Sequence, residues 1–510
     1  MIWEELVKIA LIGTERGKLP EQATEALSRL GIDVESNPAQ VVLEGAALYH
    51  QLRRAGFPIP TYQGDTPVAI DEDEDNKAVV SIRSARHLKL ILEGRFQQAL
   101  PEYLHLLKQH QKRIPPEHLP TLFYFSLKSP PLWRIVQENL TPAGQWLLRQ
   151  NPDWAALSVR PDVETWPDAV HEEQLAILRF IRQAQPEEAV ALLKGIWSET
   201  SYPHKKAFLE EMERGLGTYD EPFLEECLDD SRKEVRAAAA SLLARLPDSA
   251  LQERLFSYAR GLFREEKGKG LALHMPEKLD DNLKKDGIGA ARKNYPGGNR
   301  AALAFDILSK IPPRRWEEHF GRPTVDALRI LASSDQKKLL LDALANAAVL
   351  HQDHRWIEAI LRYWWRTNDE EAWAGSRGKL LMEHLPEPVF NEIALQHLKQ
   401  NPGFIEEKSF LSQMLGMGTH YWDKALAQLV VKGFQQWLSG ARAYYWNLWH
   451  YKRILEVAAY RIDPGHLENF RTGWDSRSPV WYRWEKDVER FLRVLAFRKE
   501  MREAMNEYNA

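Results

Sequence analysis

The chain has 510 residues, of which 44% are hydrophobic and 27% are charged. These values are typical of folded proteins and argue against disorder, while the length exceeds what a single core covers, so several domains or an elongated repeat array are expected. The 68 Lys and Arg nearly balance the 72 Asp and Glu, giving a net charge of -4, which argues against a dedicated nucleic-acid-binding protein because such proteins usually carry a basic excess.

The single cysteine and the first residues indicate the compartment. Cys227 has no partner for an internal disulfide and cannot form a cysteine-based zinc site, which is typical of a reducing environment. Glu4 and Glu5 interrupt the first apolar residues, so no signal peptide is expected. No stretch approaches the roughly 18 apolar residues of a membrane span. We therefore expect a cytoplasmic protein with no membrane segment.

Apolar residues recur at intervals of three and four along the chain, and the alternation typical of strands is nearly absent. The first apolar stripe ends at Gly13, and a helix is expected to begin at Asn37-Pro38 and to end at Gly56. Residues 63–77 include an acidic run from Asp71 to Asp75. We interpret this segment as a solvent-exposed linker, because a calcium loop would need spaced ligands and a turn glycine.

Helices are expected again at 84–94, 101–112 and 119–127, with short connections that contain proline. Short connections make successive helices antiparallel neighbours, as in stacked helix pairs. The segment 229–247 resembles the second helix of a HEAT repeat. A capping box of Ser231 and Glu234 is expected there. One apolar stripe follows, made of Val235, Ala238, Ala239, Leu242 and Leu246.

A repeated pair of residues also suggests a helical-repeat protein. Arg315-Trp316 and Arg355-Trp356 lie 40 positions apart, and each pair enters an amphipathic stretch. This spacing suits HEAT or armadillo arrays. The predicted fold is therefore all-α, a HEAT-like α-solenoid of stacked antiparallel helix pairs.

The helical pattern is interrupted once, from Gly261 to Asn299, where glycine and proline are frequent. A loop of this length in a helical array is either functional or disordered. The predicted organisation is an N-terminal helical segment, an acidic linker, a HEAT-like region, a Gly-rich basic loop and a C-terminal HEAT-like region, at 1–62, 63–77, 78–260, 261–299 and 300–510.

No catalytic, metal or cofactor site is predicted. Phosphate-binding loops, His-Glu-x-x-His and Gly-x-Ser-x-Gly do not occur, and the turn at 375–379 lacks the spacing of a phosphate loop. His351 and His354 could share a helix face, but no third ligand is evident, so we interpret them as surface residues. The expected protein is not an enzyme and has no cofactor, although a site assembled from scattered residues stays open.

Two groups of residues could bind a partner. The loop at 261–299 carries a cluster of cations that would suit an anionic surface, and the candidate contact residues are Lys284, Lys285, Arg292 and Lys293. The chain also holds 18 Trp, many of them late, which could form a recognition face or a stacking platform for single strands. Ordinary solvation of the loop and ordinary core packing of the aromatic residues are the alternatives.

The chain resembles an uncharacterised bacterial family, a domain of unknown function (DUF5691). The matching segments are Trp3-Glu4-Glu5-Leu6-Val7, 10–16, 46–48, 53–56, Gly144-Gln145-Trp146-Leu147-Leu148, 151–154, Asp286-Gly287 and 312–316. One departure is Ala143 before Gly144, where the family more often has Arg. The resemblance implies a HEAT-type helical protein encoded beside MoxR-type AAA+ ATPases, von Willebrand factor A-domain proteins and SWIM zinc-finger proteins. It implies no catalytic residues.

The favoured hypothesis is a non-enzymatic scaffold or adaptor that binds protein partners, as stacked helix pairs generally do. The resemblance implies a part in a chaperone-like or metal-insertion system, with a MoxR-type AAA+ ATPase or a von Willebrand A-domain protein as partner. The alternative is a helical-repeat protein that binds nucleic acid through the basic loop and the late aromatic residues. A continuous basic face would favour the alternative, and mixed charge would favour the scaffold.

Overall fold

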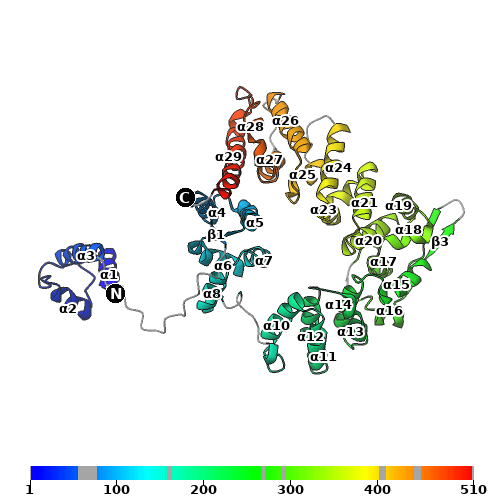
Figure 1. The fold of residues 1–510 in the computed structure, drawn as a ribbon, viewed down its shortest axis with the longest axis horizontal. Helices are drawn as coiled ribbons and strands as arrows, with labels where there is room; N and C mark the ends of the chain where they lie inside the picture. The colour runs from blue at the N-terminus through cyan, green and yellow to red at the C-terminus, as the bar shows by residue number, and fades with distance from the viewer. Residues whose placement is uncertain are drawn as a thin grey trace. The chain divides into compact units, whose positions relative to one another are not determined.

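We analysed a computed structural model of the chain, which describes residues 2–55, 77–154, 157, 163–266, 270–289, 295–400, 409–440 and 449–507. The chain divides into two compact units, Met1–Ala69 and Ile70–Ala510. The acidic run at 71–75 and most of the predicted linker lie outside the described residues. Figure 1 shows the helices that make up most of both units.

The described part of the first unit, residues 2–55, contains three helices, α1 (Ile2–Ile12), α2 (Glu21–Arg29) and α3 (Pro38–Ala55). Gly13 follows α1 with a positive φ of 94°, and Asn37 accepts a hydrogen bond from Ala39 N at the start of α3. A small separate core holds the helices together, made of Leu6, Ile9, Leu27, Ile32, Val41 and Val42. The predicted starts and stops of this unit are therefore confirmed at Gly13 and at Asn37-Pro38.

Four of the first five described helices of the second unit have proline in their first turn, where it is tolerated because the first amides have no partner within the helix. The five helices are α4 (Ile82–Leu92), α5 (Leu100–Gln109), α6 (Leu119–Leu127), α7 (Pro130–Gln137) and α8 (Pro142–Gln150), of which α5 to α8 carry such a proline. Next come α10 (His171–Ala184), α11 (Glu188–Ile196), α12 (Tyr202–Glu211), α13 (Glu221–Cys227), α14 (Lys233–Leu243), α15 (Ala250–Arg260) and α16 (Asp281–Lys285).

The remaining helices complete the second unit. They are α17 (Gly298–Leu308), α18 (Arg314–Phe320), α19 (Thr324–Ala332), α20 (Lys337–Leu350), α21 (His354–Arg366), α22 (Glu370–Ala374) and α23 (Ser376–Glu383). The last are α24 (Glu387–Gln400), α25 (Phe410–Met417), α26 (Lys424–Gly440), α27 (Trp449–Arg461), α28 (Leu467–Phe470) and α29 (Trp481–Met505). The all-α class predicted from apolar spacing is confirmed, with 28 α-helices among the described residues.

Four short strands are described. β1 (Ala78–Val79) pairs in parallel with β2 (Lys112–Arg113), and β3 (Phe263–Glu266) pairs antiparallel with β4 (Gly270–Leu273), with Phe263 opposite Leu273. β3, β4 and α16 all lie in the segment 261–299, which was expected to be a loop. These elements span four or five residues each, too few for a hydrophobic period to be visible in the sequence.

Helices of the second unit pack against helices one to three positions further along the chain. Contacts join α10 to α12, α12 to α14, α17 to α20, α20 to α23, α23 to α25, α25 to α27 and α27 to α29. Ion pairs follow the same spacing, joining residues 29 to 38 positions apart, at Arg254–Glu225, Lys194–Glu226, Arg377–Asp342 and Arg182–Asp220.

The alanine-rich helix α14 is buried as its stripe predicts. Val235 and Ala239 are fully buried, Leu242 is nearly so, and Ala238 is partly buried. The expected capping box of Ser231 and Glu234 is wrong, because α14 begins at Lys233 after Arg232, with no side-chain cap. Asp230 and not Ser231 fixes this turn, since its Oδ1 accepts from Arg232 N at 2.8 Å.

The two Arg-Trp pairs place their tryptophans in the core. Trp316 on α18 and Trp356 on α21 are 1% and 0% exposed. The Trp356 indole donates to Glu317 Oε1 at 2.7 Å, which links the two helices. Core packing therefore explains why a tryptophan stands at the second position of each Arg-Trp pair.

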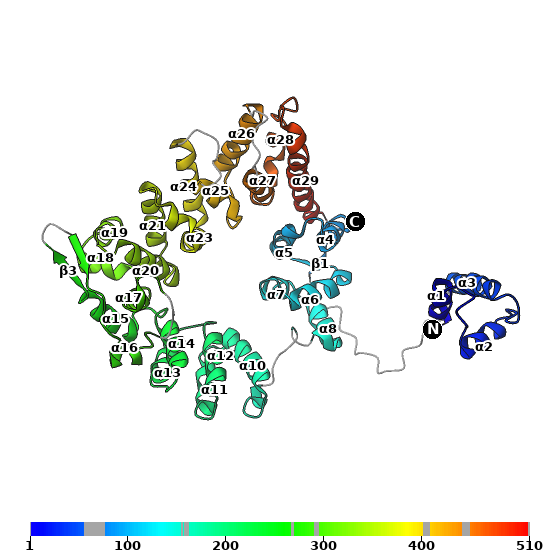
Figure 2. The ribbon, with the colours of Figure 1, turned by 180° about the vertical axis from the view of Figure 1, so that it is seen from behind.

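The last helix packs against the first helices of the same unit, a contact between residues about 400 positions apart in the chain (Figure 2). Arg498 Nε of α29 donates to Glu102 Oε2 of α5 at 2.6 Å, and Phe497 stacks on Phe96 with ring centroids 3.9 Å apart. Ser81 Oγ, at the start of α4, donates to Ala504 O at 3.1 Å. Residues 78–154 are thus attached through α29 to the C-terminal helices.

None of the described helices combines the length and the apolar character that crossing a membrane would require.

Candidate interaction site at α16

The predicted partner-binding segment is built around the short helix α16 and its contact with α14. Asp280 caps α16 by accepting from Leu283 N at 2.8 Å, and the Leu283 side chain is buried. The helix ends at Lys285, and Gly287, two residues on, has a positive φ of 72°. A Cβ at this position would lie 2.6 Å from Arg236 O and 2.7 Å from Ala240 Cβ. Only glycine allows α16 to approach α14 this closely.

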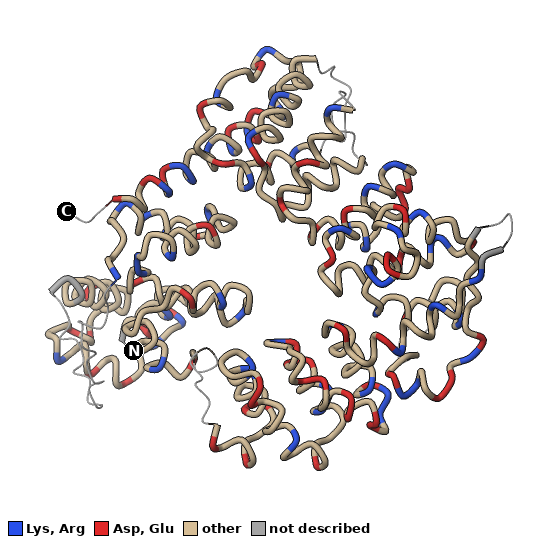
Figure 3. Tube along the Cα trace, turned by 45° about the vertical axis from the view of Figure 1, so that its right-hand side comes forward, with Lys and Arg blue, Asp and Glu red and all other residues tan. Residues whose placement is uncertain are grey.

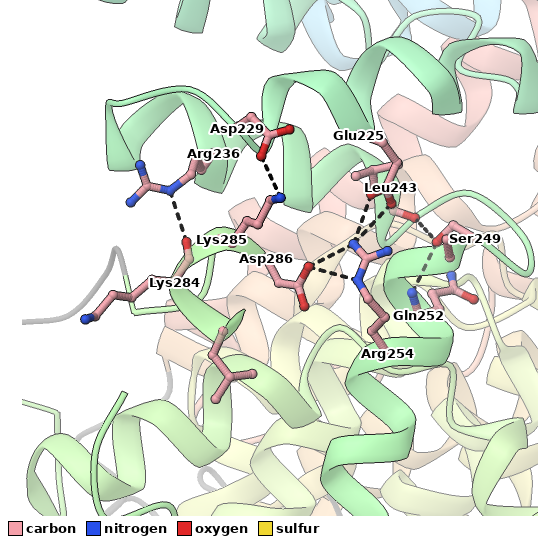
Figure 4. A network of polar contacts seen from close by, with 12 residues as sticks. Glu225, Asp229, Arg236, Leu243, Ser249, Gln252, Arg254, Lys284, Lys285 and Asp286 are labelled. Atoms are coloured by element: carbon pink, nitrogen blue, oxygen red, sulfur yellow. Dashed lines mark hydrogen bonds and ion pairs between the residues drawn. The ribbon is translucent and has the colours of Figure 1, made fainter. Parts of the chain in front are cut away.

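Asp286, next to this glycine, points into the protein and binds an arginine (Figure 4). Arg254 Nε donates to Asp286 Oδ1 at 2.9 Å, and Arg254 Nη2 donates to Glu225 Oε2 at 3.0 Å. Burial disfavours the charge on Arg254, but its hydrogen bonds to Asp286 and Glu225 outweigh this effect and raise the pKa of the guanidinium. Asp286, the first residue of the Asp-Gly pair in the family resemblance, therefore links α16 to Arg254 of α15 and, through Arg254, to Glu225 of α13.

The predicted contact residues divide into two that the structure describes and two that it does not. Lys284 Nζ pairs with Asp281 at 2.8 Å, and Lys285 Nζ pairs with Asp229 at 2.8 Å. The exposed fractions of the two lysine side chains are 50% for Lys284 and 61% for Lys285. Figure 4 shows the Lys284 side chain directed away from the network around Arg254. Arg292 and Lys293 lie outside the described residues.

The surroundings of α16 are more acidic than the sequence analysis assumed. A cleft of about 890 Å³ lies between α13, α15 and α16. Its lining includes five carboxylates and two cations, which are Glu225, Glu226, Asp229, Asp280 and Asp286 against Arg254 and Lys285. Because Lys284 and Lys285 each already have an acidic partner, their charges are partly neutralised for an approaching anion.

The cysteine and the two histidines that the sequence analysis weighed as reactive or metal-binding residues do not form a reactive site in the structure. Burial raises the pKa of the Cys227 thiol to about 12, so the thiolate needed for nucleophilic attack is scarce at neutral pH. His351 is half-buried and its Nε2 lies 3.0 Å from Lys310 O, whereas His354 is exposed. Within the described ranges, no group of three or more His, Cys, Asp or Glu could hold a metal ion.

The late aromatic residues are divided between core and surface. Trp484 is fully buried, and Trp437, Trp474 and Trp481 pack partly buried against the core. Trp449 and Tyr482 are exposed, at 63% and 70%. Tyr444, Tyr445 and Trp446 lie outside the described residues. Core packing therefore explains several of these residues but not Trp449 and Tyr482.

A second concave region escaped the sequence analysis. It runs over the C-terminal halves of α14, α17 and α20 and over the turns that follow them, and its lining includes Arg245, Arg314 and Arg355. These residues are more than 100 positions apart at the extremes, so no local motif contains them. The repeated Arg-Trp pair was the available signal, since Arg355 belongs to the second pair and Arg314 precedes the first.

Comparison with known families gives one match, which covers nearly the whole chain. The model of a family of unknown function (DUF5691) matches residues 5–505. The chain belongs to this family. No curated protein and no solved structure matches the chain. The description of the DUF5691 family assigns no catalytic or binding residue that could be transferred to this chain.

Proposed function

We propose that the chain is a non-enzymatic, HEAT-like α-solenoid that serves as a scaffold for protein partners. The observation that carries this proposal is the packing of the second unit, in which many helices from α10 onward contact a helix two or three positions further along, and ion pairs join residues about one helix pair apart. An array that stacks in this way buries the faces between neighbours and leaves long lateral surfaces free for a partner.

Mixed surface charge favours protein over nucleic acid as the partner. Figure 3 shows Lys and Arg interspersed with Asp and Glu along the helices. Many exposed cations are paired with carboxylates on neighbouring helices, as in Lys108–Glu138 and Lys194–Glu226. A nucleic-acid-binding surface would present unpaired cations in a continuous stripe.

The family resemblance suggests the partner, a MoxR-type AAA+ ATPase or a von Willebrand A-domain protein, with the scaffold acting in a chaperone-like system. In this proposal Lys284, Lys285, Arg292 and Lys293 form one contact. Each described member of this set has an exposed amine held by an exposed acid, and such a pair exchanges readily for another carboxylate because surface ion pairs are weak.

The test is reconstitution with purified proteins. The full chain, carrying an affinity tag, is incubated with the MoxR-type ATPase and the von Willebrand A-domain protein of the same genome, and binding is measured by co-precipitation and light scattering. We expect a complex with at least one of them. In parallel, fluorescence anisotropy measures binding to random DNA and RNA, where we expect no better than the nonspecific range of about 10⁻⁴ to 10⁻⁶ M. Nanomolar, salt-sensitive binding to nucleic acid without a protein complex would favour the alternative function.

A further inference from the structure

Three helix-to-helix turns that are separated in the chain lie along one edge of the second unit. The turn after α14 holds Arg245 and Pro247. The turn after α17 holds Pro312 and leads into Arg314 at the start of α18, and the turn after α20 spans residues 351–353 and leads into His354 and Arg355 at the start of α21. Together they line a cleft of about 640 Å³. This cleft shares Arg245, Leu350 and Gln352 with a neighbouring hollow of about 490 Å³ over α14, α17, α20 and α23, so the two form one groove.

Buried hydrogen bonds hold this edge in place. Gln252 Nε2 donates to Ala244 O and to Leu246 O, both at 2.7 Å, which ties α15 to the end of α14. His351 Nε2 lies 3.0 Å from Lys310 O and joins the end of α20 to the end of α17. Asp353 caps α21 by accepting from Trp356 N. A groove whose walls are fixed before binding loses little entropy when a ligand enters it.

The turn edge of the groove is positively charged. Its lining contains three arginines and a single carboxylate, Asp353, which is already engaged as the cap of α21. Arg314 meets Asp248 at 3.3 Å in a pair that is 47% and 73% exposed, which is worth little because water screens it. Arg245 is paired with Glu213. Arg355 is exposed and makes no ion pair or hydrogen bond with any residue that the structure describes.

One buried acceptor in the cleft also lacks a partner. Gln252 lines the cleft and is 1% exposed, and its Oε1 accepts no hydrogen bond within the described residues. A buried acceptor without a donor is costly, by about 1 to 3 kcal/mol.

The rest of the groove offers polar and apolar contacts, together with the Glu213 carboxylate that pairs with Arg245. Asn346, Ser241 and Leu350 line it, and the charged pair Asp306–Lys310 is internally neutralised one helical turn apart. An amide side chain both donates and accepts, which matches the N–H and C=O groups that an extended peptide leaves unpaired. An amide, a hydroxyl and apolar side chains next to a cationic edge therefore suit a polypeptide with acidic side chains.

We propose that this groove binds an extended acidic segment of a protein partner, with the carboxylates of the segment at Arg314 and Arg355 and its backbone over Asn346. The proposal rests on the scaffold function and specifies one of its recognition surfaces. Nucleic acid is the less suitable occupant, because the few cations at this edge would neutralise few phosphates.

The experiment is a selection of displayed random peptides on the full chain, followed by anisotropy measurements with the best labelled synthetic peptide. We expect the selected peptides to be rich in Asp and Glu. The double variant Arg314→Glu/Arg355→Glu should weaken the binding of that peptide at least about tenfold and reduce its salt dependence. The variant Asn346→Arg, which fills the groove without removing a cation, should weaken it as well.

The matched control is Arg322→Glu/Arg329→Glu, which makes the same change of charge at exposed positions that do not line the groove. It should bind the peptide like the unchanged chain. Circular dichroism and thermal melting check that all variants are folded. Selection of peptides without acidic residues, or equal loss in the control and the groove variants, would overturn the proposal. If the ATPase or the von Willebrand A-domain protein binds while no acidic peptide does, the scaffold function stands and the groove assignment fails.

Discussion

The Arg182 guanidinium and the Asp220 carboxylate form a bidentate ion pair inside the second unit, with both N–O distances at 2.8 Å and both side chains fully buried. The remaining donors of Arg182 bind the carbonyl oxygens of Pro186, Met212 and Arg214. Asp220 also accepts from Gly217 N at 3.0 Å. One buried charge pair thus fixes the ends of α10 and α12 and the start of α13.

Replacing Asp220 should therefore be severe. Asp220→Asn removes the charge but keeps the shape, and leaves Arg182 buried without a counter-ion, so we expect a loss of about 3 to 5 kcal/mol in the free energy of unfolding. Equilibrium denaturation with urea measures it. The control is Glu226→Gln, which breaks the exposed pair with Lys194 and should cost less than about 1 kcal/mol. Similar losses for both variants would contradict the structural role assigned to Arg182.

Gly287 offers a second test, because the cost of its positive φ can be separated from the cost of its close contacts with α14 by comparison with another glycine. Gly287→Ala should destabilise through the positive φ and through the clash with Arg236 O, for a loss of about 2 to 4 kcal/mol. Gly321→Ala is the matched control, since Gly321 has a φ of 60° but nothing within 4 Å of an added Cβ. It should lose only about 1 kcal/mol. Thermal melting of both variants decides whether α16 packs on α14 as closely as described.

The comparison of sequence and structure shows which features spacing can predict. The all-α class and the burial of Val235, Ala239 and Leu242 followed from apolar residues at intervals of three and four. The capping box at Ser231 failed because a neighbouring acid, Asp230, accepts a hydrogen bond from the Arg232 amide, and the helix starts one residue later, at Lys233. Local rules select the type of an element more reliably than its first residue.

The candidate sites were harder to predict because their members are distant in the chain. Lys284 and Lys285 were identified as cations, but Asp229, which neutralises Lys285, lies 56 positions earlier (285 − 229). Arg245, Arg314 and Arg355 share a groove only because three turns stack along one edge. Without tertiary contacts, a sequence gives the charge of a segment and not the charge of the surface to which it contributes.

Two histidines, the buried His420 and the half-buried His351, predict a dependence of stability on pH. Burial lowers the pKa of His351 and of His420 below the ordinary value of 6.5, although hydrogen bonds with Lys310 O and Leu385 O oppose this effect. The unfolded chain takes up these protons near pH 6.5 and the folded protein only at lower pH. Both histidines therefore contribute stability above about pH 6.5, and that contribution is lost as the pH falls toward their folded-state pKa values, by at most about 1.4 kcal/mol per pH unit for each.

The double variant His351→Gln/His420→Gln tests this assignment, since glutamine can donate a hydrogen bond but does not titrate. Melting temperatures between about pH 7 and about pH 5 should fall less steeply for this variant than for the unchanged chain. Replacing the exposed His354 by Gln should leave the slope unchanged. An identical slope in all three proteins would show that other groups cause the pH dependence.

Glu102 connects the two ends of the second unit, since its carboxylate binds both Arg498 at 2.6 Å and Arg502 at 2.7 Å. Glu102→Gln should leave the fully buried Arg498 without its counter-ion and loosen α29 from α5, with a loss of about 3 kcal/mol. Hydrogen exchange should then speed up in α4, α5 and the end of α29 before it does in α14 or α20. Arg83→Gln, which breaks an exposed pair with Glu507, is the control and should change exchange little.

Charge reversal at α16 tests the contact predicted from the sequence. The variant changes Lys284, Lys285, Arg292 and Lys293 to Glu. Lys284 and Lys285 have exposed acidic partners, so breaking these pairs should leave the melting temperature nearly unchanged. If the segment binds an acidic surface of the partner, association should be slower and less dependent on salt, because long-range attraction between opposite charges sets the association rate. Stopped-flow binding to the protein recovered by reconstitution measures both effects.

The control reverses Lys108 and Lys194, exposed lysines that pair with acids elsewhere. An association rate that is unchanged in the α16 variant, with an unchanged melt, would remove this segment from the interface and leave the groove at Arg314 and Arg355 as the surface to test.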